Sequence, residues 1–483
     1  MVSMFRSLAL LVFLLLVALA GGSYIAAGNT PPATIVINQP GGPIGARGTL
    51  EFTAGASRGR FTRLEAVLDQ NGRTFPLFTI DAPGDATITR LDADHLRIAR
   101  PIGKSAVPEL QPGPAKVTII AIRTSFLRIR DVATTVSKDI EVRLDPPRIA
   151  VLSTKHYLNH GGSEFVVYRA TPPDVDSGVR VGNIEYPGFP ASGAGVPGTD
   201  PAVKVAFFAL LHDQPLRAPV AAFARDAAGN EATVSFIDDV FEKPFRKSRI
   251  TIDDRFLGRV VPEILQHSPQ ARVRRSMDNP NDLLADFLIV NGDLRQANAD
   301  QIATLAKGTA PELLWKGPFT QLGNSQVEAA FADARTYVYN GKDVDRQTHL
   351  GFDLAVTANV PVLAANAGTV VNADWLGIYG NCVIIDHGLG VASLYGHLSS
   401  IDVKVGDSVS KGQTLGLSGM TGLAAGDHLH FTMLVGGHPV NPVEWWDPHW
   451  VQDRVERKLR DAGVPAAPAA SRLQVKIHRH RRG

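Results

Sequence analysis

The 483-residue chain has a single cysteine and almost no net charge. Because Cys382 has no second cysteine to pair with, no internal disulfide can form, and hydrophobic cores must stabilise the fold. The 49 basic and 47 acidic residues leave a formal net charge of +2, which does not favour nucleic acid as a partner. Hydrophobic residues make up 44% of the chain, and its length suggests about three domains.

The first 29 residues have the layout of an export segment. Arg6 precedes thirteen unbroken apolar residues, 8–20, that end in small side chains, as in a secretory signal peptide. The apolar character continues to Ala27, so the stretch also reaches the ~20 residues that span a bilayer. The sequence leaves a cleaved signal and an uncleaved membrane anchor equally open, and either one predicts that most of the chain is exported.

Residues 30–245 consist of short alternating segments separated by Gly, Pro and Asn, a pattern typical of strands. The prolines at 146–147 divide these segments into two sets, which predicts two tandem β-sandwich domains, 30–145 and 146–245. In the second set, the turn "RDAAGNEA" resembles the last hairpin of bacterial immunoglobulin-like modules. We expect these domains to act as spacers or caps, unless they bind a ligand or inhibit the last domain.

Residues 246–336 change to helical spacing, which predicts a mixed α/β connecting region. In "NADQIATLAKG", Asn298 is expected to cap a helix that Gly308 ends. Nothing in this region predicts chemistry. At the other end of the chain, residues 451–483 predict a charged helix, a Pro/Ala-rich linker and a basic tail.

Polar side chains recur on one face of three apolar segments in the last third of the chain. In "HLHF" the alternation of a strand points both histidines to one side and the leucine and phenylalanine to the other. The segments "HLGFDLA" and "VASLYGHLS" follow the same rule. The pairs that should share a face are His349 with Asp353, Tyr395 with His397, and His428 with His430. Three strands are therefore expected to present polar groups from an apolar backing.

Three nitrogen or oxygen donors with one position left for water form the usual ligand set of a catalytic zinc. His349, Asp353 and one histidine of the pair 428 and 430 can supply that set. Zinc would polarise a carbonyl and lower the pKa of a bound water from about 15.7 to roughly 7. The remaining histidines would then move protons or stabilise an oxyanion.

Residues 337–446 resemble the M23 family of zinc metallopeptidases, also called the LytM or lysostaphin type. The family's H-x-G-x-D motif is present at 349–353 and its H-x-H motif at 428–430. The resemblance implies one Zn²⁺ per catalytic domain, an antiparallel sheet, and specific roles for five residues. It assigns His349, Asp353 and His430 as zinc ligands, and His397 and His428 as catalytic histidines.

Two other residues near these motifs are expected to be structural. His387 heads a Gly-flanked turn and matches no ligand position of the family, and Cys382 reads as a buried strand residue. The hairpins between the motifs also resemble those of biotinyl and lipoyl carrier domains. However, the motif around a modified lysine is missing, so Lys411 is expected to be a solvated turn residue.

The predicted fold is mainly β, and its six parts end in a peptidase domain. The parts are a signal peptide or membrane anchor (1–29), a β-sandwich (30–145), an immunoglobulin-like β-sandwich (146–245), a mixed α/β connecting region (246–336), an M23-type zinc peptidase domain (337–450), and a charged helix with a basic tail (451–483).

The resemblance implies an exported zinc metalloendopeptidase that hydrolyses peptide cross-links of peptidoglycan, with D,D-endopeptidase activity expected. Its location would be the periplasm or cell envelope, with inner-membrane association through the N-terminal segment. One alternative is a non-hydrolytic protein that binds or activates another cell-wall hydrolase. A second is an enzyme kept latent by its own N-terminal domains. All five site residues are present, which favours an active enzyme.

Overall fold

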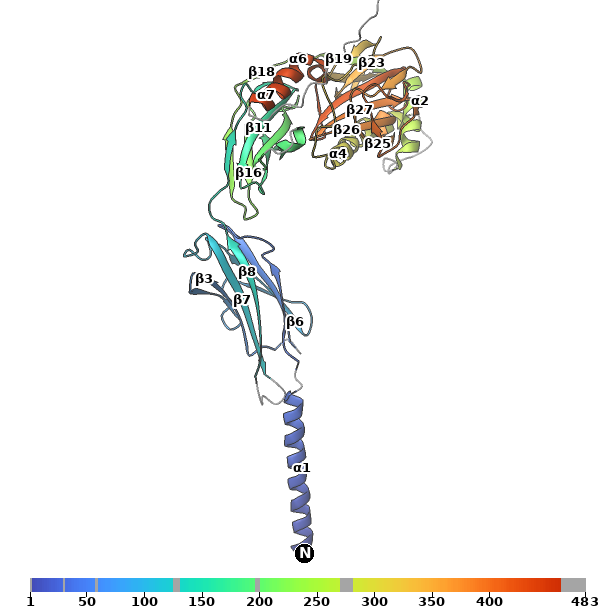
Figure 1. Ribbon diagram of the computed structural model, residues 1–483. Helices are drawn as coiled ribbons and strands as arrows, with labels where there is room; N and C mark the ends of the chain where they lie inside the picture. The colour runs from blue at the N-terminus through green and yellow to red at the C-terminus, as the bar shows by residue number, and fades with distance from the viewer. Residues whose placement is uncertain are drawn as a thin grey trace, which may run out of the picture. The chain divides into compact units, whose positions relative to one another are not determined.

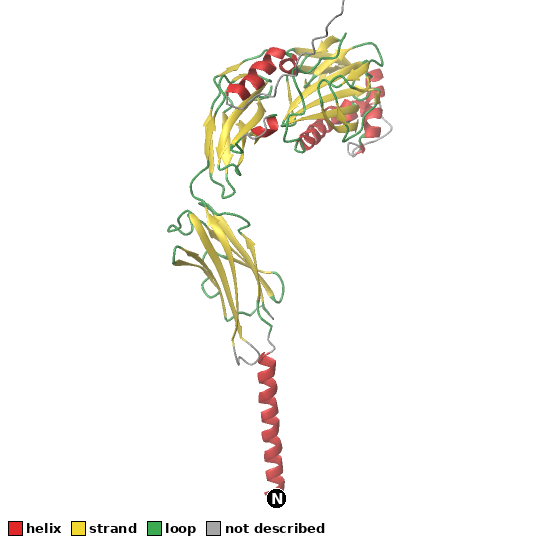
Figure 2. Ribbon diagram, in the orientation of Figure 1, coloured by secondary structure: helices red, strands yellow, loops and turns green. Residues whose placement is uncertain are grey.

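The computed structural model describes residues 2–28, 31–56, 60–124, 131–195, 200–269 and 281–461 (Figure 1). The chain is mainly β with antiparallel sheets, as predicted (Figure 2). It divides into two compact units, Met1–Pro147 with Arg225–Ala232, and Arg148–Ala224 with Thr233–Gly483. The predicted linker and basic tail at 462–483 lie outside the described residues. The residue bounds that we predicted for the domains stay predictions.

Helix α1 (Val2–Gly28) covers the predicted export segment. Its side chains are described for residues 10–25. Within the part of the chain searched, the structure contains no helix of sufficient length and apolarity to cross a membrane. Export of the chain and its association with a membrane stay predictions.

The first unit contains two four-stranded antiparallel sheets that enclose one core. The strand orders are β1-β2-β6-β5 and β4-β3-β7-β8. Buried residues such as Phe52, Leu64, Ile98 and Ile119 come from both sheets and form a single cluster, as in a β-sandwich. The immunoglobulin-like relationship predicted for the next domain stays a prediction. The strands are β1 (Thr34–Gln39), β2 (Gly48–Gly55), β3 (Arg63–Gln70), β4 (Arg73–Thr79), β5 (Thr87–Arg90), β6 (His95–Ile102), β7 (Gly113–Thr124) and β8 (Asp131–Val142).

The second unit begins with two further four-stranded sheets, β14-β15-β11-β9 and β13-β12-β16-β17, and a two-stranded pair, β10-β18. Strand β11 is buried almost throughout, and its consecutive apolar residues 165–168 all belong to one hydrophobic core. The strands are β9 (Arg148–Val151), β10 (Tyr157–Asn159), β11 (Ser163–Thr171), β12 (Asp176–Val181), β13 (Ile184–Pro187), β14 (Phe189–Pro190), β15 (Val203–Ala209), β16 (Val220–Arg225), β17 (Glu231–Ser235) and β18 (Asp239–Phe241).

The following region contains both helices and strands, as predicted. Its sheet has the order β19-β21-β22, and an amphipathic helix, α2, buries Leu257, Val260 and Ile264. Asn298 does not cap a helix, so that prediction was wrong. It lies buried inside α4, where its Oδ1 accepts a hydrogen bond from Ile378 N at 3.1 Å. The elements are β19 (Lys247–Ile252), α2 (Asp254–His267), α3 (Asn281–Ile289), η5 (Val290–Leu294), α4 (Arg295–Ala306), β21 (Asp333–Tyr339) and β22 (Lys342–His349).

The last domain is built on a large antiparallel sheet with the order β20-β23-β31-β27-β26-β25-β29, and β32 pairs with β31. A second, three-stranded sheet has the order β24-β30-β28, and its strands come between β23 and β31 in the chain. The elements are β20 (Gln326–Ala329), β23 (Phe352–Ala355), β24 (Pro361–Leu363), β25 (Gly368–Trp375), η6 (Gly377–Tyr379), β26 (Asn381–Gly388), β27 (Val391–Leu398), β28 (Ser400–Ile401), β29 (Ser408–Val409), β30 (Thr414–Leu417), β31 (His428–Val435) and β32 (His438–Val440).

Short C-terminal helices bind this domain to strand β11 of the same unit. Trp445 is fully buried, and its Nε1 donates to Ser163 Oγ at 3.2 Å. Lys458 forms a buried ion pair with Glu164 at 2.7 Å. Residues 158–224 and 315–459 therefore contribute to one continuous hydrophobic core. The helices are α5 (Pro442–Trp446), α6 (Pro448–Val451), η7 (Gln452–Glu456) and α7 (Arg457–Asp461).

Candidate metal centre

Neighbouring strands bring the three predicted ligands together. β23 and β31 are paired antiparallel, with Asp353 directly opposite His430. His349 ends β22, and only two residues separate it from the start of β23, so the chain turns its imidazole back to the same point. Among the residues that the structure describes, these side chains make up the only group of three or more His, Cys, Asp or Glu placed to hold a metal ion.

The facing atoms of the three side chains form a nearly equilateral triangle. His349 Nε2 lies 2.8 Å from Asp353 Oδ1 and 3.1 Å from His430 Nδ1, and the third side of the triangle is 3.0 Å. Tetrahedral zinc with ligands at 2.0–2.1 Å requires ligand atoms roughly 3.3 Å apart. The donor set and its spacing therefore fit one zinc ion with a fourth position left open.

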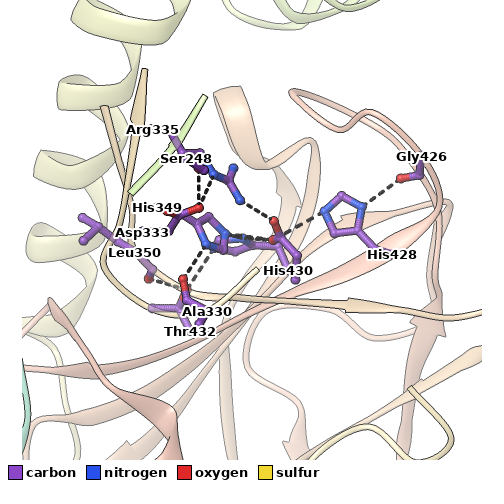
Figure 3. A network of polar contacts seen from close by, with 11 residues as sticks. Ser248, Ala330, Asp333, Arg335, His349, Leu350, Gly426, His428, His430 and Thr432 are labelled. Carbon is purple, nitrogen blue, oxygen red and sulfur yellow. Dashed lines mark hydrogen bonds and ion pairs between the residues drawn. The ribbon is translucent and has the colours of Figure 1, made fainter. Parts of the chain in front are cut away.

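Each ligand histidine uses its outer nitrogen to bond a fixed partner. His349 Nδ1 lies 3.1 Å from the Ala330 carbonyl oxygen, which can only accept, so this nitrogen carries the proton and Nε2 faces the other ligands. His430 Nε2 lies 3.0 Å from Thr432 Oγ1. Figure 3 shows both partners on the far side of the imidazoles from the ligand atoms. Such partners orient ligand histidines and raise their basicity.

The third ligand has a partner that sequence reasoning missed. Arg335, on β21, donates from Nη2 to Asp353 Oδ2 at 2.9 Å, which leaves Oδ1 for the other ligands. Arg335 Nε faces Asp333 Oδ2 at 3.6 Å, and Ser248 Oγ donates to the same oxygen at 2.7 Å. These three residues come from the connecting region, for which no chemistry was predicted. No motif surrounds them, so the sequence carried no signal for their role.

Two further histidines, the predicted catalytic pair, stand beside the ligands with their ring centroids 4.8 Å apart. His397 Nδ1 is 2.8 Å from the Thr421 carbonyl oxygen, and His428 Nδ1 is 2.8 Å from that of Gly426. Both Nδ1 atoms must therefore donate, and both Nε2 atoms remain for other partners. The structure thus brings all five predicted site residues to one place.

Burial and mutual contact set the charges of this cluster. Burial lowers the pKa of His430 to about 4, so its imidazole is neutral and can offer a lone pair. Burial, with the neighbouring imidazoles, also holds the pKa of His397 well below 6.5. Although burial opposes ionisation of Asp353, the adjacent histidines hold its pKa well below 3.8. Burial likewise opposes the charged form of His428, but Asp353 outweighs it and raises that pKa.

Residues 347–442 match the family model of Peptidase family M23. They form an M23 peptidase domain. Peptidoglycan DD-endopeptidase ShyA of Vibrio cholerae is 44% identical over 96 residues, which make up 20% of this chain and 22% of ShyA. DD-carboxypeptidase/endopeptidase Mpg of Neisseria meningitidis is 41% identical over 95 residues, with the same two shares, 20% and 22%. The matched region thus spans about a fifth of the length of either curated relative.

Among solved structures, the catalytic domain of lysostaphin from Staphylococcus simulans aligns with 27% of this chain and 98% of that domain. The sequence identity is 28% and the TM-score is 0.24.

Two of the predicted segments depart from strand alternation in the M23 domain. His349 and Asp353 do not belong to one strand, because β22 ends at His349 and β23 begins only at Phe352, in another sheet. Tyr395 and His397 do not share a face. The Tyr395 ring packs on Phe431 in the core, and its hydroxyl accepts a hydrogen bond from Ala365 N at 2.8 Å. His397 reaches the metal centre because its φ of 64° turns the chain out of the extended conformation.

His387 and Cys382 lie in β26 of the M23 domain, and both are completely buried. His387 Nδ1 is 2.7 Å from the Ala367 carbonyl oxygen, and Nε2 is 2.7 Å from Ser393 Oγ. With both ring nitrogens bonded inside the fold, His387 is not available as a ligand. Lys411 is a turn residue whose Nζ donates to the Pro318 carbonyl oxygen at 2.6 Å.

A cleft of about 440 Å³ opens over the metal centre. One wall belongs to the M23 domain and includes Tyr379, whose ring lies 5.3 Å from that of His430. Other lining residues lie in or directly next to β19 and β21, and they include Arg246 and Tyr337. Of the residues that the structure describes, those lining the cleft all lie between 246 and 430, so residues 148–224 contribute none.

Proposed function

We propose that this chain is an exported zinc metalloendopeptidase that hydrolyses the peptide cross-links of peptidoglycan, acting as a D,D-endopeptidase. The observation that carries the proposal is the ligand triangle of His349, Asp353 and His430, with the imidazoles of His397 and His428 beside it. The names of ShyA and Mpg, which both include endopeptidase, support the reaction class.

Zinc, when bound by these three residues, supplies a Lewis acid that polarises the scissile carbonyl and makes water a stronger nucleophile at neutral pH. The chain's own residues supply proton transfer and orientation. His397 and His428 are locked in one tautomer by backbone carbonyls, so each presents Nε2 to the reacting groups. They share the removal of a proton from water, the stabilisation of the oxyanion and the delivery of a proton to the leaving amine.

The site favours hydrolysis over the non-hydrolytic alternative. A protein that only binds another hydrolase needs no metal ligands, whereas here all three ligands are present and oriented by Ala330, Thr432 and Arg335. Latency through the second sandwich has no support from the cleft, which residues 148–224 do not line.

The location of the enzyme is proposed from the sequence pattern of residues 1–29 alone. We propose the periplasm or cell envelope, where peptidoglycan lies, with the N-terminal segment as a signal or inner-membrane anchor. Cell fractionation tests this proposal, and recovery of the chain in the cytosol would contradict it.

The function is tested by measuring zinc content and release of cross-linked peptides from purified peptidoglycan with the full chain. Wild type should carry about one zinc and digest the polymer. His430→Ala should lose both properties because only two ligands remain. His397→Ala should keep its zinc but lose activity by about 10²–10⁴-fold because proton transfer is impaired. His449→Ala, the same change at an exposed histidine, is the control and should behave as wild type.

A zinc-loaded wild type that leaves peptidoglycan intact, with and without residues 1–147, which lie outside the core shared by residues 158–224 and 315–459, would overturn the hydrolase proposal. That result would favour the alternative function, in which the chain binds or activates another cell-wall hydrolase. Loss of digestion in the His449→Ala control would show instead that the assay reports on folding.

A further inference from the structure

His430 could bind a metal through either ring nitrogen, and its surroundings decide which one is used. Nδ1 faces Asp353 Oδ1 at 3.0 Å and His349 Nε2 at 3.1 Å. Nε2 faces away, toward Thr432 Oγ1 at 3.0 Å. His430 is 5% exposed, so water is not the partner that fixes its imidazole.

The Thr432 hydroxyl has only one proton, and that proton is already committed. Oγ1 donates to the Leu350 carbonyl oxygen at 3.0 Å, and the residue is 1% exposed. Because the hydroxyl donates there, it can only accept from His430, so Nε2 must carry the imidazole proton. The lone pair of the neutral ring is then left on Nδ1, the atom in the ligand triangle.

Leu350 lies between the ligands His349 and Asp353 in the chain. The hydroxyl of Thr432 therefore ties strand β31, which carries His430, to the segment that carries the other two ligands (Figure 3). A single buried group thus sets the tautomer of one ligand and adds a side-chain contact between two ligand segments that strand pairing already joins.

Gly351 provides the room for this contact. A Cβ atom at this position would lie 2.5 Å from His430 Nε2 and 2.6 Å from Thr432 Oγ1. Both distances are well inside van der Waals contact, and the neighbours are the two atoms of the hydrogen bond. The glycine between the ligands at 349 and 353 is thus explained by the packing of the third ligand rather than by its own backbone conformation.

We infer that Thr432 is a positioning residue for the metal centre: its hydroxyl holds His430 as the Nε2–H tautomer and directs Nδ1 to the metal, in space that Gly351 leaves open. The inference rests on the proposed zinc function. It assigns to the hydroxyl a role in zinc affinity that the methyl group of the same side chain does not share.

The test compares Thr432→Val, which keeps the shape of the side chain but loses the hydroxyl, with Thr432→Ser, which keeps the hydroxyl. Zinc affinity of the full chain is measured by competition with a chelator. Thr432→Val should bind zinc about 10–100-fold more weakly, and Thr432→Ser should stay close to wild type. Thr369→Val makes the same change on β25, three strands from β31 in the sheet order, and should leave zinc affinity unchanged.

A second measurement follows the tautomer directly. Nitrogen-15 NMR of the zinc-loaded wild type should place the His430 proton on Nε2, and Gly351→Ala should disturb that signal. A proton on Nδ1 would overturn the inference, and so would undiminished zinc affinity in Thr432→Val. If Thr432→Val does not fold, Thr432→Ala replaces it, and affinity equal to that of Thr432→Ser would again overturn the inference.

Failure of the proposed function gives a different result. A chain that binds zinc with the expected Thr432 dependence but digests no peptidoglycan would leave the positioning role standing and remove the enzyme. A wild type that binds no zinc would remove both.

Discussion

His387 lies in the middle of β26 with both ring nitrogens bonded and no contact with solvent. Its Nδ1 donates to the Ala367 carbonyl oxygen at 2.7 Å, and its Nε2 lies 2.7 Å from Ser393 Oγ. Burial lowers the pKa of His387 to about 4, compared with about 6.5 for an exposed histidine. The fold therefore holds this imidazole neutral, and protonation opposes folding.

The lowered pKa predicts that stability falls on the acid side of neutrality. The contribution of His387 is fully present above pH 6.5 and is lost as the pH falls toward 4, because the unfolded state binds the proton first. Between pH 8 and pH 5 the loss should be about 2 kcal/mol. Urea unfolding followed by tryptophan fluorescence measures it, since all five tryptophans lie beyond residue 314 and report on the second unit.

The control for this prediction is His387→Asn, whose amide can still donate to Ala367. The variant should be less stable than wild type at pH 8 but should lose less stability between pH 8 and 5. The buried His156, with a pKa lowered to about 3 by burial, titrates in both proteins and cancels in the comparison. Parallel curves for wild type and variant would show that His387 does not titrate as argued.

At the scale of single elements, strand alternation predicted most of the site correctly and failed where the backbone leaves the extended region. His428 and His430 share a face because β31 is regular from end to end. In β27, His397 has a φ of 64°, which few non-glycine residues adopt, and its neighbour Tyr395 faces the core instead. A pattern of residue types contains no signal for such a turn. Asn298 escaped prediction for a related reason, because its partner, Ile378, is distant in sequence.

The turn between β26 and β27 depends on Gly388 for two reasons. Its φ is +83°, and an added Cβ would overlap the carbonyl oxygen of Glu312. Glu312 belongs to the segment 310–314, which packs on this turn. Hydrogen bonds from Leu389 N to Ala310 O at 2.8 Å and from Leu314 N to His387 O at 2.9 Å hold the segment there. An alanine at 388 must therefore push the segment away as well as strain the backbone.

We predict that Gly388→Ala lowers the free energy of unfolding of the second unit by about 3 kcal/mol or more. Gly412→Ala is the matched control, since Gly412 has a φ of +82° but no atom within 4 Å of an added Cβ. The control should lose only the backbone cost of about 1–2 kcal/mol. Urea unfolding by tryptophan fluorescence measures both, and equal losses would refute the role of the Glu312 contact.

At the scale of the whole molecule, local motifs predicted the site's centre but not its surroundings. The ligands lie in two short motifs, and the strands β23 and β31 that carry Asp353 and His430 are paired neighbours in one sheet. The motifs alone were therefore enough to predict the ligand set. Arg335 and Ser248 reach the centre from separate strands, and their contacts cross long stretches of chain. The same limit applies to Lys458, which belongs to a predicted charged helix yet is 2% exposed.

Lys458 is buried because it joins the C-terminal helices to β11. Its Nζ lies 2.7 Å from Glu164 Oε1 and donates to the Phe165 carbonyl oxygen at 2.9 Å. Glu164 is 0% exposed and also accepts from the backbone N of Tyr157 at 3.1 Å. Burial opposes both charges, raising the pKa of Glu164 and lowering that of Lys458 to about 8. The attraction between the two charges offsets that cost only while both are present.

Removing one partner should therefore cost more than removing the charge from both. We predict that Lys458→Met destabilises the second unit by about 3–5 kcal/mol at pH 7, because Glu164 is left as a buried charge without its main partner. Lys458→Met combined with Glu164→Gln should recover at least half of that loss, since the glutamine still accepts from the backbone but carries no charge. Urea unfolding followed by tryptophan fluorescence compares the two proteins with Glu164→Gln alone. If the losses of the single variants simply add in the double variant, the helices are held by apolar packing around Trp445, and the ion pair contributes no coupling between them and β11.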